Sequence, residues 1–116
     1  MGEIGAVVYR LGNEPRTLSA QWVYSTSDPN GVGSGTAFRS DEGGTGFTGR
    51  WEIAYRGADG TDAGRYLLEI DQDDAVYALR WLRDGVVVFE GAGFVVDGAL
   101  IGGWRPCASP ANGTVR

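Results

Sequence analysis

The sequence predicts an all-β fold, an eight-stranded antiparallel up-and-down β-barrel. Turn signals recur every 11 to 18 residues along the 116-residue chain, and short segments rich in Val, Ile, Tyr, Trp and Phe lie between them. Twenty glycines punctuate the chain, many of them beside Asp in these turns. Regularly spaced strands with short connections favour an antiparallel meander, and eight strands can close into a barrel that leaves no free edge.

The turns define eight expected strands. Gly supplies positive φ, and Asp or Asn tolerates the left-handed region, so these residues mark the connections. The turns are Asp28-Pro29-Asn30-Gly31, Asp41-Glu42-Gly43-Gly44, Asp59-Gly60, Asp71-Gln72-Asp73-Asp74, Asp84-Gly85 and Asp97-Gly98. The strands are expected near 4–10, 18–25, 33–39, 47–56, 64–71, 75–83, 86–95 and 99–105.

The segment 73–83 also has features of a helix. It begins with Asp, contains good helix formers and is followed by Gly85, a typical helix stop. Against a helix, Tyr77, Leu79 and Trp81 alternate with polar or small residues, as a half-buried strand requires. Asp-Gly directly after the segment is also a strong hairpin signal. We therefore expect a strand and keep the helix as the alternative.

The chain length predicts one domain over residues 1–105, followed by an irregular Pro-, Ala- and Gly-rich tail at 106–116. A chain of this size buries roughly two-thirds of its unfolded surface, which suffices without metals or disulfides. Cys107 is the single cysteine, so no internal disulfide forms and no oxidising compartment is implied. No run of about 20 apolar residues and no signal peptide is visible, so a cytoplasmic location is the default expectation, with no membrane contact.

The composition excludes several classes of chemistry. The chain contains no His and no Lys, which rules out Ser-His-Asp and Cys-His sites, His-ligated metals and a Walker P-loop. We expect no cofactor and no metal. The net charge of −5 and the scattered Arg residues argue against a nucleic-acid partner. The Arg-rich, Lys-free composition is typical of GC-rich bacterial genomes.

The two Asp-Gly turns predict the register of the last three strands. A two-residue loop at 84–85 places Leu79 opposite Glu90, and one at 97–98 places Glu90 opposite Arg105. Directly opposed residues share one face of a sheet. The expected inner face comprises Trp51, Ile53, Tyr55, Tyr66, Leu68, Ile70, Tyr77, Leu79, Trp81, Val86, Val88, Glu90, Phe94, Ile101 and Arg105. The outer face comprises Arg65, Leu67, Glu69, Val76, Arg80, Leu82, Val87, Phe89, Val95, Leu100 and Trp104.

Two further pairings follow from the same turns. Trp81 is expected opposite Val88, and the acidic turn at 71–74 is expected to place Ile70 opposite Ala75. The face that includes Trp51, Tyr66 and Trp81 is taken as the barrel interior. It has more aromatic residues than the other face and carries charge only at Glu90 and Arg105.

The inner face predicts a ligand site. Its wall would be aromatic, with Glu90 and Arg105 orienting the polar end of a mostly apolar ligand. The expected ligand-binding residues are Trp51, Tyr55, Tyr66, Tyr77, Trp81, Glu90 and Arg105. A structural ion pair between Glu90 and Arg105 is the alternative. If the barrel is catalytic, the candidates for proton transfer are Glu90, Tyr66 and Tyr77.

The outer face predicts a possible self-association surface. An exposed apolar patch of this size is typical of an interface, so a homodimer is plausible. Its residues are Leu82, Val87, Phe89, Val95, Leu100 and Trp104.

The final hairpins resemble those of small bacterial calycin-like barrels of the lipocalin and fatty-acid-binding type, including families of unassigned function. The resemblance covers 47–104 and is carried by Tyr77-Ala78-Leu79-Arg80-Trp81, Gly91-Ala92-Gly93 and Leu100-Ile101-Gly102-Gly103-Trp104. It implies an eight-stranded barrel whose interior holds a small apolar molecule. Bacterial barrels of similar shape also include cyclases of natural-product pathways.

The sequence therefore leaves three functions open. The first is binding of a small hydrophobic or aromatic molecule inside the barrel. The second is a metal-free cyclase or isomerase that uses a Tyr hydroxyl or Glu90. The third is a cavity-free barrel that acts through dimerisation or partner contact. A void of about 300 Å³ or more is expected for either ligand-based function.

Overall fold

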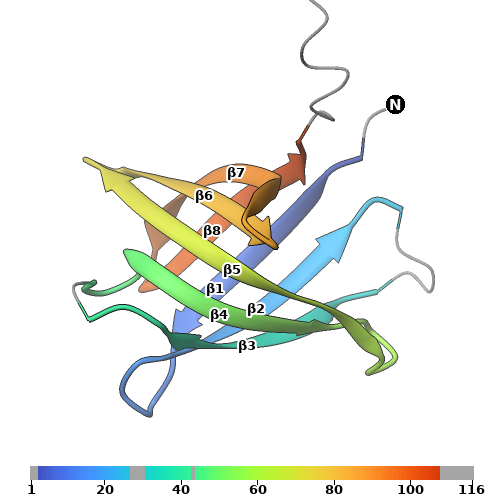
Figure 1. Ribbon diagram of the computed structural model, residues 1–116, viewed down its shortest axis with the longest axis horizontal. Coiled ribbons are helices and arrows are strands. Elements are labelled where there is room, and N and C mark those ends of the chain that lie inside the picture. Colours follow the sequence, from blue (N-terminus) through green and yellow to red (C-terminus); the bar gives the residue numbers. More distant parts are fainter. Residues whose placement is uncertain (1–2, 27–30, 43, 108–116) are drawn as a thin grey trace, which may run out of the picture.

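The protein is an all-β barrel of eight antiparallel strands in meander order, closed by pairing of the first strand with the last (Figure 1). The computed structural model describes residues 3–26, 31–42 and 44–107. The strands are β1 (Gly5–Leu11), β2 (Thr17–Tyr24), β3 (Gly33–Arg39), β4 (Gly49–Arg56), β5 (Asp62–Asp73), β6 (Val76–Arg83), β7 (Val86–Val96) and β8 (Ala99–Pro106). Within these ranges no helix is long and apolar enough to cross a membrane. The predicted fold class is confirmed. The irregular tail expected at 106–116 lies mostly in 108–116, outside the described residues.

The segment expected to be either strand or helix is strand β6. Leu79 and Trp81 are buried, while the intervening Arg80 is exposed, as the two-residue period of a strand requires. Asp84 and Gly85 have φ values of 52° and 78°, which are the positive angles of a tight type I′ hairpin. The helical alternative is therefore wrong: alternation and turn chemistry outweigh the helix propensity of the segment.

The turn between β5 and β6 is tighter than expected. Asp73 pairs with Val76, so only two residues form the loop, and Ile70 pairs with Leu79 instead of Ala75. The error in register is four residues. Because this is an even number, every side chain of β5 and β6 still lies on its predicted face.

A β-bulge in β7 has the opposite consequence. Near the hairpin Leu82 pairs with Val87, but one step further Trp81 pairs with Phe89, which leaves Val88 as the extra residue. A slip of one residue moves all subsequent side chains to the other face of the sheet. The predicted pairing of Glu90 with Arg105 is confirmed, but both residues lie outside the barrel.

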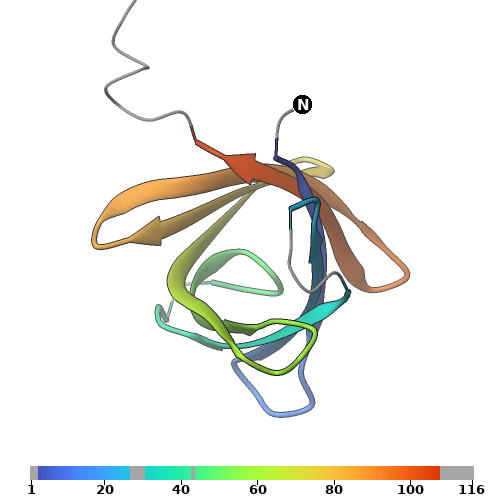
Figure 2. The ribbon, with the colours of Figure 1, turned by 90° about the vertical axis from the view of Figure 1, so that its right-hand side faces the viewer.

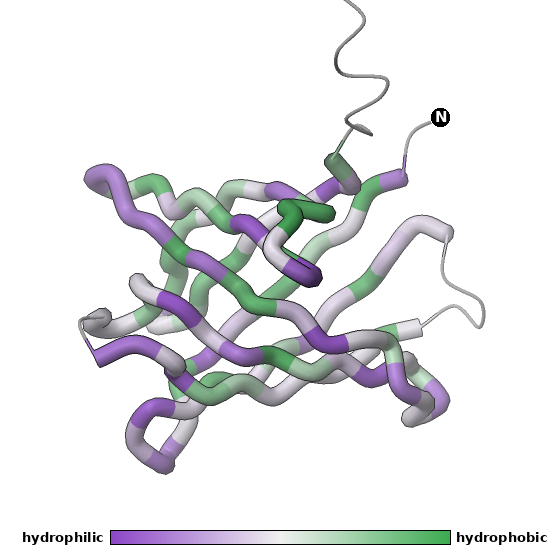
Figure 3. Tube along the Cα trace, in the orientation of Figure 1, coloured by the Kyte–Doolittle hydropathy of each residue, from purple (hydrophilic) through white to green (hydrophobic). Residues whose placement is uncertain are grey.

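The same slip changes the rest of the predicted inner face. Phe94 and Ile101, expected inside, are exposed, whereas Leu100, expected outside, is fully buried. The core comprises Val7, Tyr9, Leu18, Ala20, Ala37, Phe47, Trp51, Ile53, Tyr55, Leu68, Ile70, Leu79, Trp81 and Leu100. Hydrophobic and hydrophilic residues alternate along β4 and β5, as a barrel wall requires (Figure 3).

One end of the barrel is closed by the segment between β3 and β4. Figure 2 looks into the barrel from the opposite end, and this green segment lies across the far opening. Phe47 from this segment is only 6 % exposed, and its carbonyl accepts a hydrogen bond of 3.0 Å from Trp51 Nε1. The Arg39 guanidinium lies 4.3 Å from the centre of the Trp51 ring and donates to the Thr48 and Gly46 carbonyls at 2.6 Å each. Rings and polar groups are thus paired with one another at this closed end.

Candidate functional site: an aromatic pocket at the open end

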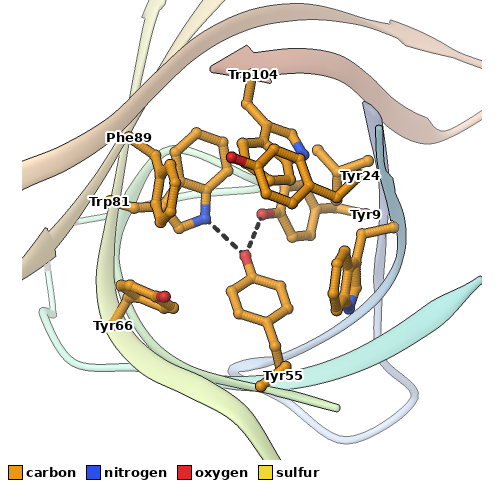
Figure 4. Close-up of a pocket in the computed structure, with 10 residues that line it drawn as sticks. Tyr9, Tyr24, Tyr55, Tyr66, Trp81, Phe89 and Trp104 are labelled. Carbon is orange, nitrogen blue, oxygen red and sulfur yellow. Dashed lines mark hydrogen bonds between the residues drawn. The ribbon is translucent and has the colours of Figure 1, made fainter. Parts of the chain in front are cut away.

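The opposite end of the barrel holds a cavity of about 150 Å³. It lies where β2, β4, β6 and β8 end and where β1, β3, β5 and β7 begin. We refer to it as the open-end pocket (Figure 4). Eight of its ten lining residues are aromatic, and no charged side chain lines it within the described part of the chain. The lining residues are Val7, Tyr9, Trp22, Tyr24, Tyr55, Ala63, Tyr66, Trp81, Phe89 and Trp104.

The aromatic rings contact one another in sequence around the pocket. Their centroid distances lie between 4.4 and 6.0 Å, close to the roughly 4.5 to 7 Å that is typical of favourable aromatic pairs. The successive contacts are Tyr24–Trp104 (4.4 Å, stacked), Trp104–Phe89 (5.1 Å), Phe89–Tyr66 (5.7 Å), Tyr66–Tyr55 (5.9 Å) and Tyr55–Trp22 (6.0 Å). Contributions from five strands therefore form one continuous aromatic wall, which the barrel backbone holds in place.

Two glycines seat the outermost indoles of this wall. A Cβ on Gly5 would lie 2.1 Å from Cε2 of Trp104, and a Cβ on Gly33 would lie 2.4 Å from Cε2 of Trp22. Any larger residue would displace the indole on the neighbouring strand. Both glycines lie within strands, where the absence of a side chain leaves space for the neighbouring indole ring. This role differs from the turn role that the sequence pattern indicates.

A small hydrogen-bond network forms the polar part of the pocket. The Tyr55 hydroxyl lies 2.6 Å from the Tyr9 hydroxyl and accepts a hydrogen bond of 2.6 Å from Trp81 Nε1 (Figure 4, dashed lines). The three residues come from β4, β1 and β6, so the network ties together three separate strands across the barrel. Neutral donors and acceptors of this kind fix the orientation of a ligand within an otherwise apolar site.

Burial keeps both tyrosines of the network neutral. Desolvation, reinforced by the neighbouring Tyr55, raises the pKa of Tyr9 well above its ordinary value of 10. Desolvation also raises the pKa of Tyr55, although the hydrogen bonds from Tyr9 and Trp81 act in the opposite direction. Both hydroxyls therefore retain their protons throughout the physiological pH range.

Charged groups at the rim of the pocket contact two rings of the aromatic wall from outside. The Arg83 guanidinium lies 4.5 Å from the centre of the Tyr66 ring and donates a 2.7 Å hydrogen bond to its hydroxyl. Tyr24 donates to the Glu3 carboxylate. Partial burial and this carboxylate raise the pKa of Tyr24 to about 12. The rim thus fixes two of the rings while the interior of the pocket stays free of charge.

The pocket includes three of the seven predicted ligand-binding residues, namely Tyr55, Tyr66 and Trp81. Trp51 lies at the closed end instead, buried beneath Arg39. Tyr77 also lies there, at the start of β6, with its ring 6.4 Å from that of Phe47. Both residues face the interior as predicted, but they lie at the end of the barrel that is filled.

Glu90 and Arg105 do not enter the pocket. They form a cross-strand ion pair of 3.1 Å on the outer surface, where their side chains are 46 % and 71 % exposed. The structural alternative for this pair is therefore correct, and the proposed polar anchor is wrong because of the bulge in β7. Of the three candidate catalytic residues, only Tyr66 reaches the pocket.

The predicted outer apolar patch does not exist as a single surface. Leu100 is fully buried in the core, and Phe89 and Trp104 line the pocket. Leu82, Val87 and Val95 remain partly or fully exposed, and Val95 pairs with the buried Leu100. A homodimer remains a prediction, without this patch to support it.

The sequence interpretation missed most of the aromatic wall. The missed aromatic residues are Tyr9, Trp22, Tyr24, Phe89 and Trp104. Those of β1 and β2 could have been found, because Val7 and Tyr9 alternate with exposed residues, as do Trp22 and Tyr24. Phe89 and Trp104 depend on the bulge, which no turn residue signals.

The open-end pocket offers aromatic surfaces and neutral hydroxyl groups, while the carboxylates of the described residues lie at the rim, in the turns or on the outer surface. The sequence matches no protein-family model, no curated protein and no solved structure at a significant level.

Proposed function

We propose that this protein binds one compact, neutral and mostly apolar molecule, about the size of a single substituted aromatic ring, in the open-end pocket. The observation that carries the proposal is a cavity bounded by eight aromatic residues at one end of a barrel whose other end is filled. Concave apolar sites with a few convergent polar groups are the usual form of small-molecule sites.

The size of the pocket limits the ligand. Its 150 Å³ is half of the roughly 300 Å³ expected for a drug-sized ligand. An apolar cavity of about 150 Å³ is nevertheless large enough for benzene, as known from an engineered cavity in another protein. A fatty acid or a polycyclic molecule could enter only in part. The proposed ligand is therefore smaller than those of the lipocalin and fatty-acid-binding barrels that the final hairpins resemble.

The lining of the pocket favours a neutral ligand. A charged group that leaves water needs a partner of opposite charge, and the described lining residues offer none. Ring edges and faces, by contrast, make favourable contacts with a second aromatic ring at centroid separations of 4.5 to 7 Å. A catalytic function is not proposed, because Glu90 and Tyr77 lie away from the pocket.

The proposal is tested with α-methylstyrene, a single substituted ring without polar atoms, by isothermal titration calorimetry. We expect a Kd of about 0.1 to 1 mM for the unmodified protein, as the ligand has few atoms. Ala63→Phe, which places a ring in the pocket, should weaken binding at least tenfold. Ala78→Phe makes the same substitution at an exposed position of β6 and should leave the Kd unchanged. Absence of binding to the unmodified protein, or equal binding by both variants, would overturn the proposal.

A further inference from the structure

We infer that the ligand of the open-end pocket carries a hydrogen-bond acceptor, such as a neutral carbonyl oxygen, which accepts a hydrogen bond from the Tyr9–Tyr55 hydroxyl pair. This inference rests on the proposed function and adds a chemical class to it. It follows from the numbers of donors and acceptors in the network formed by Tyr9, Tyr55 and Trp81.

The network contains more donors than internal hydrogen bonds. Trp81 contributes an N–H that can only donate, and the two tyrosines contribute one O–H each, which makes three donors. The geometry provides two hydrogen bonds, Trp81 to Tyr55 and one between the two hydroxyls. Whichever tyrosine donates to the other, the second keeps an O–H proton without an acceptor inside the network.

No other group in the described part of the chain takes this proton. Neither hydroxyl has a hydrogen bond to a carbonyl or carboxylate oxygen there. The nearest charged groups of the rim are engaged elsewhere, Arg83 with Tyr66 and Glu3 with Tyr24. Both hydroxyls nevertheless belong to residues that line the pocket. The spare proton is therefore available to a bound molecule.

The surroundings make this proton a selective feature. Tyr9 is fully buried and Tyr55 is only 8 % exposed, so an unmatched donor here costs more than it would at the surface. A ligand with a neutral acceptor satisfies this donor, whereas a hydrocarbon of the same shape leaves it unpaired. A carboxylate would also accept this hydrogen bond. Its burial would be unfavourable, however, because its charge would lose water among aromatic rings without a cationic partner.

The test compares two ligands of nearly identical shape. Acetophenone carries a carbonyl oxygen where α-methylstyrene carries a methylene group, and both contain one ring. We expect acetophenone to bind the unmodified protein about three- to tenfold more tightly, the effect of one neutral hydrogen bond. If no donor is available, burial of the carbonyl is unfavourable and α-methylstyrene binds more tightly. Equal or reversed affinities would contradict the inference and leave the proposed function standing. Binding of neither ligand would contradict both.

Variants identify the donor. Tyr9→Phe/Tyr55→Phe/Trp81→Phe removes all three donors of the network, so the preference for acetophenone should disappear or reverse. Tyr66→Phe removes a hydroxyl of the same pocket that lies outside the network, and it should retain the preference. Loss of the preference in Tyr66→Phe would place the donor at the rim and contradict the inference.

A spectroscopic measurement keeps the test independent of the stability of the triple variant. Tyrosine labelled with ¹³C at Cζ reports the hydrogen bonding of each hydroxyl in the unmodified protein. We expect acetophenone to shift the Cζ signal of Tyr9 or Tyr55, and α-methylstyrene to shift it much less. Equal shifts with both ligands would show that ring contact alone is responsible and would contradict the inference.

Discussion

The two ends of this barrel are built from the same kinds of residue but differ in how completely these residues are paired. At the closed end, Phe47 and Trp51 are buried, the indole N–H is bonded to a carbonyl, and Arg39 covers the ring. At the open end, the aromatic rings surround a cavity, and the Tyr9–Tyr55–Trp81 network retains one donor without an internal acceptor. Both ends are rich in aromatic residues, so aromatic content alone does not distinguish them. The open end differs by its empty space and by its unmatched polar group.

We expect the greatest loss of stability from a Phe→Ala substitution, and its size should differ between the two ends of the barrel. Phe47→Ala removes a buried ring that fills the closed end, and we expect it to lower the free energy of unfolding by about 3 to 5 kcal/mol. Phe89→Ala removes a partly buried ring that borders an existing cavity, so we expect a loss below about 2 kcal/mol. Urea unfolding followed by circular dichroism measures both. The reverse order would mean that the open end is the structural one.

The second prediction concerns the loss of stability at alkaline pH, which should come from Tyr9 and Tyr55 of the open-end pocket. The pKa values of Tyr9 and Tyr55 are raised in the folded protein, mainly by burial, so above pH 10 the unfolded chain releases protons that the folded chain retains. The stability from these groups is complete below pH 10 and is lost as the pH rises beyond it. The slope is about 1.4 kcal/mol per pH unit for each tyrosine.

Unfolding measured between pH 8 and pH 11.5 tests this expectation. Tyr9→Phe should reduce the slope above pH 10 by the contribution of one proton. A slope that is unchanged in this variant would show that Tyr9 ionises normally in the folded protein, contrary to its burial in the network.

The network itself should respond unequally to the loss of its members. Tyr55→Phe removes the acceptor of Trp81 and the partner of Tyr9, so we expect a loss of about 1 to 3 kcal/mol. Tyr9→Phe leaves the Trp81–Tyr55 bond intact and should cost about 1 kcal/mol or less. Equal losses in chemical unfolding would show that Tyr55 is not the centre of the network.

The smallest effect is expected outside both ends. Glu90→Gln breaks an exposed ion pair with Arg105 on the outer surface of β7 and β8. Exposed pairs contribute little, so we expect a change in stability below about 0.5 kcal/mol and no change in the Kd of α-methylstyrene. A tenfold change in Kd would return Glu90 to the ligand site.

The sequence predicts the barrel well because its signals are local. Each of the Asp-Gly hairpins lies at its predicted position, and alternation identifies Ile53, Tyr55, Leu68 and Trp81 as inward-facing residues. Even the four-residue register error between β5 and β6 does no harm, because it preserves the faces. Fold class and three of the strands in the wall therefore follow from turn chemistry and periodicity.

The site is harder to predict because it depends on one unpaired residue. The bulge at Val88 reverses the faces of β7 and β8, and this moves Glu90 outward and Phe89 inward. The bulge carries no glycine to mark it, so no local motif in the sequence indicates it. The filling of one end by Phe47 likewise depends on a loop whose path no periodicity predicts.

The indole N–H signals of the four tryptophans test the difference between the two ends most directly. Trp22, Trp81 and Trp104 line the open-end pocket, whereas Trp51 lies at the closed end. In a ¹H–¹⁵N spectrum recorded during titration with α-methylstyrene, we expect the first three signals to shift along a common saturation curve. The Trp51 signal should stay in place. A shift of Trp51 equal to the others, or no shift of any of them at millimolar ligand, would contradict the assignment of the open end as the ligand site.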